Sequence, residues 1–276
     1  MRTNDLCRFI NERERIRLRK EAGLPRAKWT NDEILGTYRF CNVRRNDDKV
    51  SRWIHENWLY RWDVPWGEES TDLWFAMAVA RLFNLPATLG AIEKTVIPFD
   101  PTGMKKILKR LGKVFNAAYI VSTNGRSMDK IDYVVDMVLK PLWKDRARLR
   151  PTANDTLDVW HTTLCQYQGL GSFMAAQIVA DMKYVEPLRS ATDWAWWAAS
   201  GPGSRKGLGW VMHGELDHHY TEKRWREEFA VLYEAVNKKL KWSEPLTGQD
   251  LQNCLCELFK YVRAKETGQM PKQIYR

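Results

Sequence analysis

The chain has 276 residues, and 44% of them are apolar, which is enough to bury a hydrophobic core and argues against bulk disorder. Lys and Arg number 44 against 34 Asp and Glu, so the formal net charge is +10 at pH 7. A surplus of this size favours a polyanionic partner such as DNA or RNA, because basic side chains near phosphates release condensed counterions. Charge alone does not separate such a binder from other basic proteins.

The cysteines indicate a reducing environment. There are five of them, an odd number, and they form no C-x-x-C pair. This pattern indicates free thiols in a cytosol-like compartment and argues against a structural zinc site. Residues 1–20 are studded with Arg and Glu, where a secretory signal would be apolar, and no apolar run approaches the length of a membrane span. We therefore expect a cytoplasmic protein without membrane contact.

The hydrophobic periodicity predicts helices along most of the chain. The charged segment 1–28 is expected to form a helix with a basic face that ends near Gly23 and Pro25. A solvated helix is the default interpretation of this segment, and a phosphate-contacting arm is the alternative. Asn31 suits the N-cap of a second helix that runs through Phe40.

Further helices are expected downstream, at 47–61, 73–83, 104–115, 131–143, 154–167, 172–183, 221–239 and 248–265. Strand-like alternation is nearly absent, and only residues 118–122 could be extended or equally helical. The sequence therefore predicts a mainly α fold, whose length suits one large domain or two closely packed helical lobes. We divide the chain into a basic N-terminal arm, residues 1–30, and a single helical catalytic domain, residues 31–276.

The most informative stretch is LCQYQGLGSFMAAQIVADMKY, within a predicted helix-hairpin-helix at about 154–184. Gly169 and Gly171 flank one apolar residue, so a tight reversal can place Leu170 in the core between two helices. We expect Gly171 to need a backbone conformation that a β-branched residue cannot take. The amides that follow, from Ser172 onward, would donate hydrogen bonds to a DNA phosphate. A turn used only for packing is the alternative.

An aspartate downstream of the hairpin sharpens this interpretation. Asp193 lies 22 residues after Gly171. The hairpin and this spacing resemble the helix-hairpin-helix DNA glycosylase superfamily, in which such an aspartate faces the extruded nucleotide. Gln177 on the second helix also matches that pattern. The alternative for Asp193 is an ordinary N-cap of a helix at 194–199. In the bifunctional glycosylases a lysine nucleophile lies shortly before the aspartate. Here Leu170 and Ser172 flank Gly171, and the nearest lysine is Lys183, so the chain departs from that pattern. It also lacks the four-cysteine loop of some relatives.

A second motif, SGPGSRKGLGW at residues 200–210, suits an anion. Its glycines would expose backbone amides, Ser204 offers a hydroxyl, and Arg205 and Lys206 add two adjacent positive charges. A plain Gly- and Pro-rich connector is the alternative. The chain contains neither G-x-x-x-x-G-K-[ST] nor G-x-G-x-x-G, which disfavours nucleotide hydrolysis through those loops.

These motifs, with YRFCNVRRNDDKV at 38–50 and the Asn124-Gly125 pair, resemble a narrower group. This group is the bacteriophage α-glutamyl/putrescinyl thymine pyrophosphorylase family, which includes the amino acid:DNA transferases. The motifs are also similar to the helical domain of 5-hydroxymethyluracil DNA kinases. The resemblance covers roughly residues 35–265 and implies a cytoplasmic location in an infected bacterial host.

The resemblance implies a reaction on thymine-derived bases in double-stranded DNA. A kinase first makes 5-pyrophosphoryloxymethyluracil, and the transferase then displaces pyrophosphate with a small amine donor, an amino acid or a polyamine. Because the phosphate-binding loop of the kinase is missing from these residues, we assign the chain to the transferase step.

The roles that this reaction requires can be assigned to residues of the motifs. Asp193 or Asp48 would accept the proton of the attacking amine, and Asn42 and Gln177 would contact the edge of an extruded pyrimidine. The expected pyrophosphate-binding residues are Ser204, Arg205, Lys206, Arg44 and Arg45.

We predict no metal ligands, although Mg²⁺ stays open as a cofactor because pyrophosphate often carries it. The histidines of HGELDHH, at 213, 218 and 219, are interpreted as part of a solvated loop. Two other functions remain open. One is a monofunctional DNA glycosylase that excises a modified pyrimidine with Asp193. The other is a non-catalytic DNA-binding module that uses the hairpin only for phosphate contacts.

Overall fold

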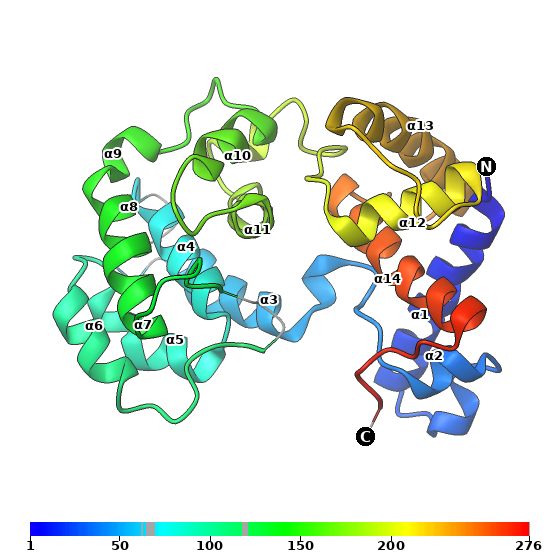
Figure 1. Cartoon of the computed structure of the whole chain (residues 1–276), viewed down its shortest axis with the longest axis horizontal. Helices are drawn as coiled ribbons and strands as arrows, with labels where there is room; N and C mark the ends of the chain where they lie inside the picture. The colour runs from blue at the N-terminus through cyan, green and yellow to red at the C-terminus, as the bar shows by residue number, and fades with distance from the viewer. Residues whose placement is uncertain (62, 65–69, 118–120, 276) are drawn as a thin grey trace. The chain divides into compact units, whose positions relative to one another are not determined.

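The computed structural model describes residues 1–61, 63–64, 70–117 and 121–275. Within these ranges the regular structure is helical, apart from an isolated antiparallel bridge between Tyr38 and Ile274 (Figure 1). The predicted mainly α fold is therefore confirmed. Residues 118–120 of the segment that could have been extended lie outside the described residues. No helix in the described part of the chain has both the length and the apolar composition needed to cross a membrane.

The chain divides by its internal contacts into two compact units. Unit 1 comprises Met1–Asp48 and Ala195–Arg276, and unit 2 comprises Lys49–Trp194. These boundaries differ from the predicted one after residue 30, because the N-terminal helix contributes apolar side chains to the core of unit 1. A single catalytic function for residues 31–276 stays a prediction.

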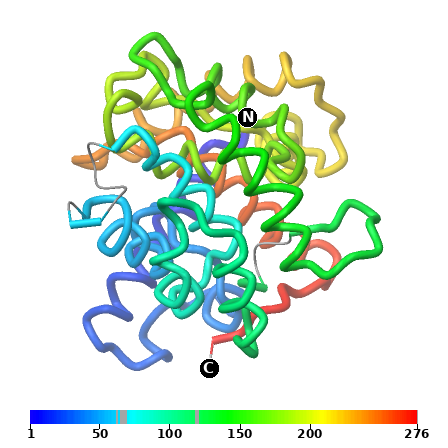
Figure 2. The backbone as a smooth tube through the Cα atoms, turned by 90° about the vertical axis from the view of Figure 1, so that its left-hand side faces the viewer, coloured from blue at the N-terminus to red at the C-terminus, as the bar shows by residue number. Residues whose placement is uncertain are grey.

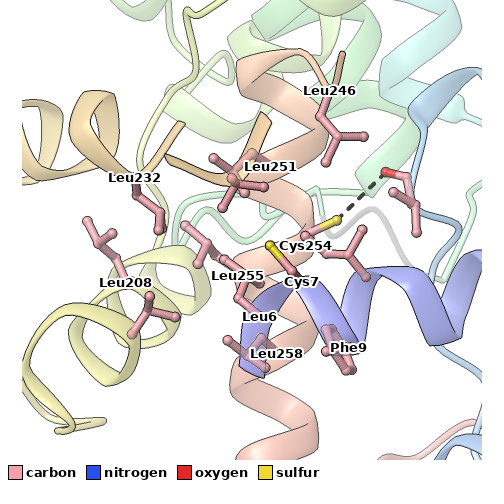
Figure 3. Packing of buried hydrophobic residues seen from close by; sticks show 14 of the residues in the cluster. Leu6, Cys7, Phe9, Leu208, Leu232, Leu246, Leu251, Cys254, Leu255 and Leu258 are labelled. Atoms are coloured by element: carbon pink, nitrogen blue, oxygen red, sulfur yellow. Dashed lines mark hydrogen bonds between the residues drawn. The ribbon is translucent and has the colours of Figure 1, made fainter. Parts of the chain in front are cut away.

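Unit 1 is a helical cluster formed by the two ends of the chain. Its elements are α1 (Thr3–Glu21), η1 (Arg26–Lys28), α2 (Glu33–Thr37), η2 (Arg45–Asp47), α12 (Pro202–His213), α13 (Glu222–Leu240) and α14 (Gly248–Thr267). Figure 3 shows how Leu6 of α1, Leu208 of α12, Leu232 of α13 and Leu255 of α14 meet in one apolar cluster. All four side chains are fully buried, so the N-terminal helix is part of the core.

The charges of α1 are largely paired along the helix. Arg17 contacts both Glu14 and Glu21, and Arg15 contacts Glu12. Arg13 is buried and points inward, where its Nη2 donates to the carbonyl oxygen of Asn42 at 3.0 Å. The face of α1 is thus less basic than its sequence suggests, which favours the solvated-helix interpretation over a phosphate-contacting arm.

Unit 2 contains the predicted hairpin. Its elements are α3 (Lys49–Ile54), the π-helix η3 (His55–Leu59), α4 (Leu73–Phe83), α5 (Pro86–Ile92), η4 (Glu93–Thr95), α6 (Pro101–Leu108), α7 (Lys130–Asp132), the π-helix η5 (Tyr133–Leu139), α8 (Lys140–Lys144), α9 (Arg146–Leu149), α10 (Leu157–Cys165), α11 (Ser172–Met182) and η6 (Leu188–Ser190). Every residue of α4 is buried, so this helix forms the centre around which the others pack.

Two expected helices have wrong boundaries. The N-cap of α2 is Asp32, whose Oδ1 accepts the amide of Leu35 at 2.9 Å, and Asn31 lies outside the helix. This helix ends at Thr37 and does not reach Phe40. The expected helix at 104–115 ends as α6 at Leu108, where a tighter turn takes over.

A buried ion pair joins α4 to α11. The Nε and Nη2 atoms of Arg81 each lie 2.5 Å from a carboxylate oxygen of Asp181, and both side chains are fully buried. Arg81 also donates to Ser51 and Asn84, at 3.2 and 3.1 Å. His55 of η3 contacts Asp181 at 3.1 Å. The second helix of the hairpin is therefore fixed to the centre of unit 2 through several charge-assisted hydrogen bonds.

The expected anion-binding loop at 200–210 is mostly a helix. α12 begins at Pro202, and its Gly203 and Gly207 face α14. A Cβ atom on Gly207 would lie 2.1 Å from the carbonyl oxygen of Leu255, and one on Gly203 would lie 3.2 Å from Cys256 Sγ. These glycines therefore allow two helices to approach closely. The prediction of a loop with exposed amides was wrong, because glycines in a helix can serve packing as well as turns.

We expect Gly207→Ala to destabilise the protein by about 1–3 kcal/mol, because its Cβ would clash with the backbone of α14. Gly90→Ala is the matched control. Gly90 also lies inside a helix, but a Cβ there would meet nothing within 4 Å. The Gly90→Ala variant should be more stable than the parent by about 0.5–1 kcal/mol, because Ala has the better helix propensity. Urea unfolding measures both, and equal effects would contradict the packing role of Gly207.

Candidate nucleic-acid interface

The hairpin predicted from the sequence consists of α10, a turn over residues 166–171, and α11. Leu170 is fully buried, as expected, and its amide donates to the carbonyl oxygen of Tyr167 at 3.1 Å. Gly169 has a φ of +85°, and a Cβ there would lie 2.4 Å from Cγ2 of Val138. The turn thus requires glycine at this position for two reasons. Assignment to a DNA-binding class of hairpin stays a prediction.

Gly171, the second glycine of the turn, differs from Gly169. Its φ of −54° is open to any residue, and a Cβ would meet nothing within 4 Å. The expectation that Gly171 needs a conformation closed to β-branched residues was therefore wrong, and Gly169 is the residue under that constraint. Gly171 is the N-cap of α11, and the open space around it allows a ligand to approach the first turn of the helix.

The start of α11 presents a polar and an aromatic group. Ser172 is exposed, and the side chain of Phe173 is 55% exposed. The first amides of a helix have no acceptor inside the helix, and the helix dipole makes this end positive. A phosphate oxygen could accept these amides while the ring of Phe173 lies against a sugar or a base.

A histidine braces the hairpin from inside. His161 of α10 is buried, and its Nε2 lies 3.0 Å from the carbonyl oxygen of Ser172. Since a carbonyl only accepts, this nitrogen must carry the proton. Sγ of Cys165 lies 3.5 Å from the same nitrogen, but burial raises the pKa of this thiol. A raised pKa keeps the thiol protonated at neutral pH, which disfavours a thiolate nucleophile at this pair.

Asp193 is part of the same substructure. It is buried, and its two carboxylate oxygens accept the amides of Leu157 and Asp158 at 2.8 and 3.0 Å. It therefore supports the N-terminus of α10, whose local cap is the hydroxyl of Thr156. The alternative of an N-cap for a helix at 194–199 was wrong, because residues 192–196 form turns. A role for Asp193 in chemistry stays a prediction.

A lysine and a tryptophan hold the segment that carries Asp193. Trp194 Nε1 donates to the carbonyl oxygen of Lys183 at 2.6 Å, and Nζ of Lys183 lies 3.4 Å from the carbonyl oxygen of Trp194. The ammonium also lies 4.2 Å from the centroid of the indole ring. These contacts clamp the two chain segments together. The sequence offered no spacing signal for the clamp.

The predicted pyrophosphate-binding residues of α12 have partners within unit 1. Arg205 donates to Ser200 Oγ, to the carbonyl oxygen of Tyr220 and to Glu222. The hydroxyl of Ser204 is buried, and it exchanges hydrogen bonds with the backbone of Gly201. Both side chains thus stabilise the start of α12.

Lys206 is the more accessible cation of this motif. Its side chain is 42% exposed and pairs with Asp217, whose side chain is 90% exposed. Exposed pairs of this kind contribute only about 0–1 kcal/mol, so a phosphate could replace Asp217 as its partner.

The remaining predicted residues of unit 1 lie at 42–48. Nδ2 of Asn42 donates to the carbonyl oxygen of Asp47 at 2.7 Å, so this amide holds the local turn. Arg44 donates to backbone carbonyls at 244–245 and stacks over the ring of Trp242. The amide of Arg45 donates to Asp250 at 2.9 Å. Asp48 is exposed.

Gln177 lies on α11 in unit 2 and is half-buried, whereas Asn42 belongs to unit 1. These two predicted base contacts therefore belong to different units. The role of either side chain in contacting a pyrimidine stays a prediction.

Two of the three histidines near the end of α12 have side-chain partners, whereas the sequence predicted a solvated loop. His213 is the last residue of α12, and its Nε2 lies 2.8 Å from Glu228. Its ring stacks on that of His218 at 4.0 Å. Among the residues that the structure describes, no group of three or more His, Cys, Asp or Glu side chains could hold a metal ion.

The two glycines of the hairpin can be separated by mutation. We expect Gly169→Ala to destabilise the protein by about 1–3 kcal/mol, through its left-handed φ and the clash with Val138. Gly171→Ala should leave stability within about 0.5 kcal/mol. Thermal or urea unfolding of the two variants checks this difference. A larger loss at Gly171 would contradict the described turn.

Asp193→Asn should destabilise the protein by about 1–3 kcal/mol, because an NH₂ group would replace one of two acceptors that face buried amides. Asp48→Asn, at an exposed carboxylate, is the control and should change stability by about 0.5 kcal/mol or less. Urea unfolding would disprove the capping role if both variants matched the parent.

Comparison with known proteins places the chain in a family. The family model for the helical domain of 5-hmdU DNA kinase matches residues 1–270. A 5-hmdU DNA kinase of Bacillus phage SP10 is 23% identical over 290 residues, which covers 94% of this chain and 45% of the phage protein. The chain thus spans less than half the length of this relative, and no solved structure matches it. Because the family match extends over nearly all of its residues, the chain belongs to the family of 5-hmdU DNA kinase helical domains.

Proposed function

We propose that the chain acts in thymine hypermodification of phage DNA, as a transferase that places an amino acid or a polyamine on 5-pyrophosphoryloxymethyluracil. The observation that carries this proposal is the family match over residues 1–270. The matched relative is a kinase for 5-hmdU in DNA, so a domain shared with it suits the same modified nucleotide. The exposed start of α11 supports contact with the DNA backbone.

The reaction is a displacement at the exocyclic methylene carbon of the base. The amine nitrogen forms a bond to this carbon, and the bond from carbon to the pyrophosphate oxygen breaks. Pyrophosphate leaves with the electron pair, and the new ammonium loses a proton to a base. The site must therefore provide cations for the leaving group and a proton acceptor for the amine.

Two side chains suit these roles best by their accessibility. Lys206 is exposed and is held only by an exposed ion pair with Asp217 and a contact with the ring of Phe259, so it can turn to a leaving pyrophosphate. Asp48 is exposed, whereas Asp193 is buried and accepts two backbone amides. We therefore favour Asp48 as the proton acceptor and assign Asp193 to holding α10.

One observation favours a second function, a DNA-binding module without chemistry of its own. Asp193, Arg205 and Ser204 each have structural partners inside their unit, which reduces the set of groups open to a substrate. A glycosylase is less well supported, because its aspartate must face the sugar of an extruded nucleotide and Asp193 is buried.

Incubation with duplex DNA containing 5-pyrophosphoryloxymethyluracil and a pool of amines, with and without Mg²⁺, separates the three functions. We expect nucleoside mass spectrometry to find an aminated thymidine, together with released pyrophosphate. Asp48→Asn should lower the turnover rate about 10²- to 10⁴-fold while leaving duplex affinity unchanged. Abasic sites would instead indicate a glycosylase, and binding without any product would indicate the module.

A further inference from the structure

A short part of unit 2 carries much of the positive charge. Between Lys94 and Lys130 there are eight Lys and Arg residues and two Asp residues, a formal charge of +6 out of +10 for the whole chain. This segment includes α6 and the residues that follow it. The hairpin motif does not include it, and the proposed reaction assigns it no role.

One flank of α6 is neutralised by acidic partners. Nζ of Lys105 lies 2.7 Å from Asp136, and Nζ of Lys109 lies 2.8 Å from Asp132. The two lysines are four residues apart and therefore lie on the same face of the helix. They face α7 and η5, which carry the two aspartates.

The neighbouring flank has no such partners. Lys106 and Arg110 are also four residues apart, and Lys113 follows closely in the chain; all three are exposed. Their side chains form no hydrogen bond or ion pair with another residue in the described part of the chain. Their like charges repel one another, and a bound anion would offset this repulsion.

The backbone beneath these charges is fixed. The hydroxyl of Thr88, which is fully buried, donates to the carbonyl oxygen of Val114 at 2.9 Å. Asn116 is bonded to the carbonyl oxygens of Phe83 and Asn84 at the end of α4. The segment after α6 is therefore tied to the centre of unit 2, which reduces the entropy lost when its cations bind a ligand.

We propose that Lys106, Arg110 and Lys113, here called the α6 flank, form a second contact surface for the phosphate backbone of duplex DNA. In Figure 1, α6 and α11 lie at opposite sides of unit 2, and in Figure 2 the α5–α6 segment lies on the side that faces the viewer. The surface is therefore separate from the hairpin. This inference rests on the DNA binding in the proposed function.

The chemistry of the α6 flank favours phosphates over a protein partner. None of the large apolar side chains found exposed in the described residues lies between residues 94 and 130. Protein interfaces need an apolar centre, whereas contacts to a DNA backbone need mainly cations. Such contacts position the duplex without selecting a base sequence.

The test is the salt dependence of duplex affinity, measured by fluorescence anisotropy on unmodified DNA. The triple variant carries Lys106→Gln, Arg110→Gln and Lys113→Gln. We expect its plot of log K against log salt to be shallower than that of the parent, with a slope smaller in magnitude by about two to three, since each phosphate contact contributes about 0.9. Thermal unfolding should show a Tm that is unchanged or slightly raised, because these side chains lose no ion-pair partner and the repulsion between their charges is removed.

A control of equal charge change replaces Lys238, Lys239 and Lys265 of unit 1, which are also exposed, with Gln. Its slope should stay near that of the parent. An unchanged slope in the α6 triple variant, or an equal fall in the control, would overturn the α6 flank while leaving DNA binding itself intact. If the parent chain itself shows no salt-dependent binding, the α6 flank and the DNA-binding part of the proposed function fail together.

Discussion

The buried pair of Arg81 and Asp181 is the constraint on which unit 2 depends. Two charges without access to water are tolerated only when their hydrogen bonds are complete, and here Ser51, Asn84 and His55 complete them. Loss of one partner would leave an uncompensated charge at the centre of the unit. The pair therefore fixes the rotation and position of α11 against α4, and with it the direction in which the start of α11 faces.

Unit 1 depends on a different constraint, the close approach of α12 and α14. Gly207 leaves no room for a side chain against the backbone of Leu255, and Arg205 ties the start of α12 to Glu222 of α13. A motif with glycines and basic residues, typical of anion loops, here serves helix packing. The same residue types suit both uses, because a missing Cβ allows either a phosphate or another helix to approach.

The helices that were predicted well from the sequence have a long apolar periodicity and a local N-cap. Examples are α13 and α14, whose N-caps are Thr221 and Thr247. The two helices α10 and α11 and the turn between them were also predictable, because two glycines around one apolar residue, Leu170, favour a tight reversal. The site was less predictable. The partners of Asp193 lie 35 and 36 residues before it in the chain, and no local pattern reports such a distance. The α6 flank likewise can be recognised only when the acidic partners of Lys105 and Lys109 are known, because the sequence alone does not show which lysines are paired.

The support of α10 by Asp193 links the hairpin to a distant part of the chain. Thr156 supplies a local hydrogen bond to the first turn of α10. Two further amides of this turn are accepted by Asp193, which the ribosome adds to the chain more than thirty residues later. The first helix of the hairpin therefore gains its full support only after the chain has closed a loop of this length, at an entropic cost that grows with the loop. A peptide cut to the hairpin alone would lack that support, so we expect its first helix to be less stable than in a segment that extends past Asp193.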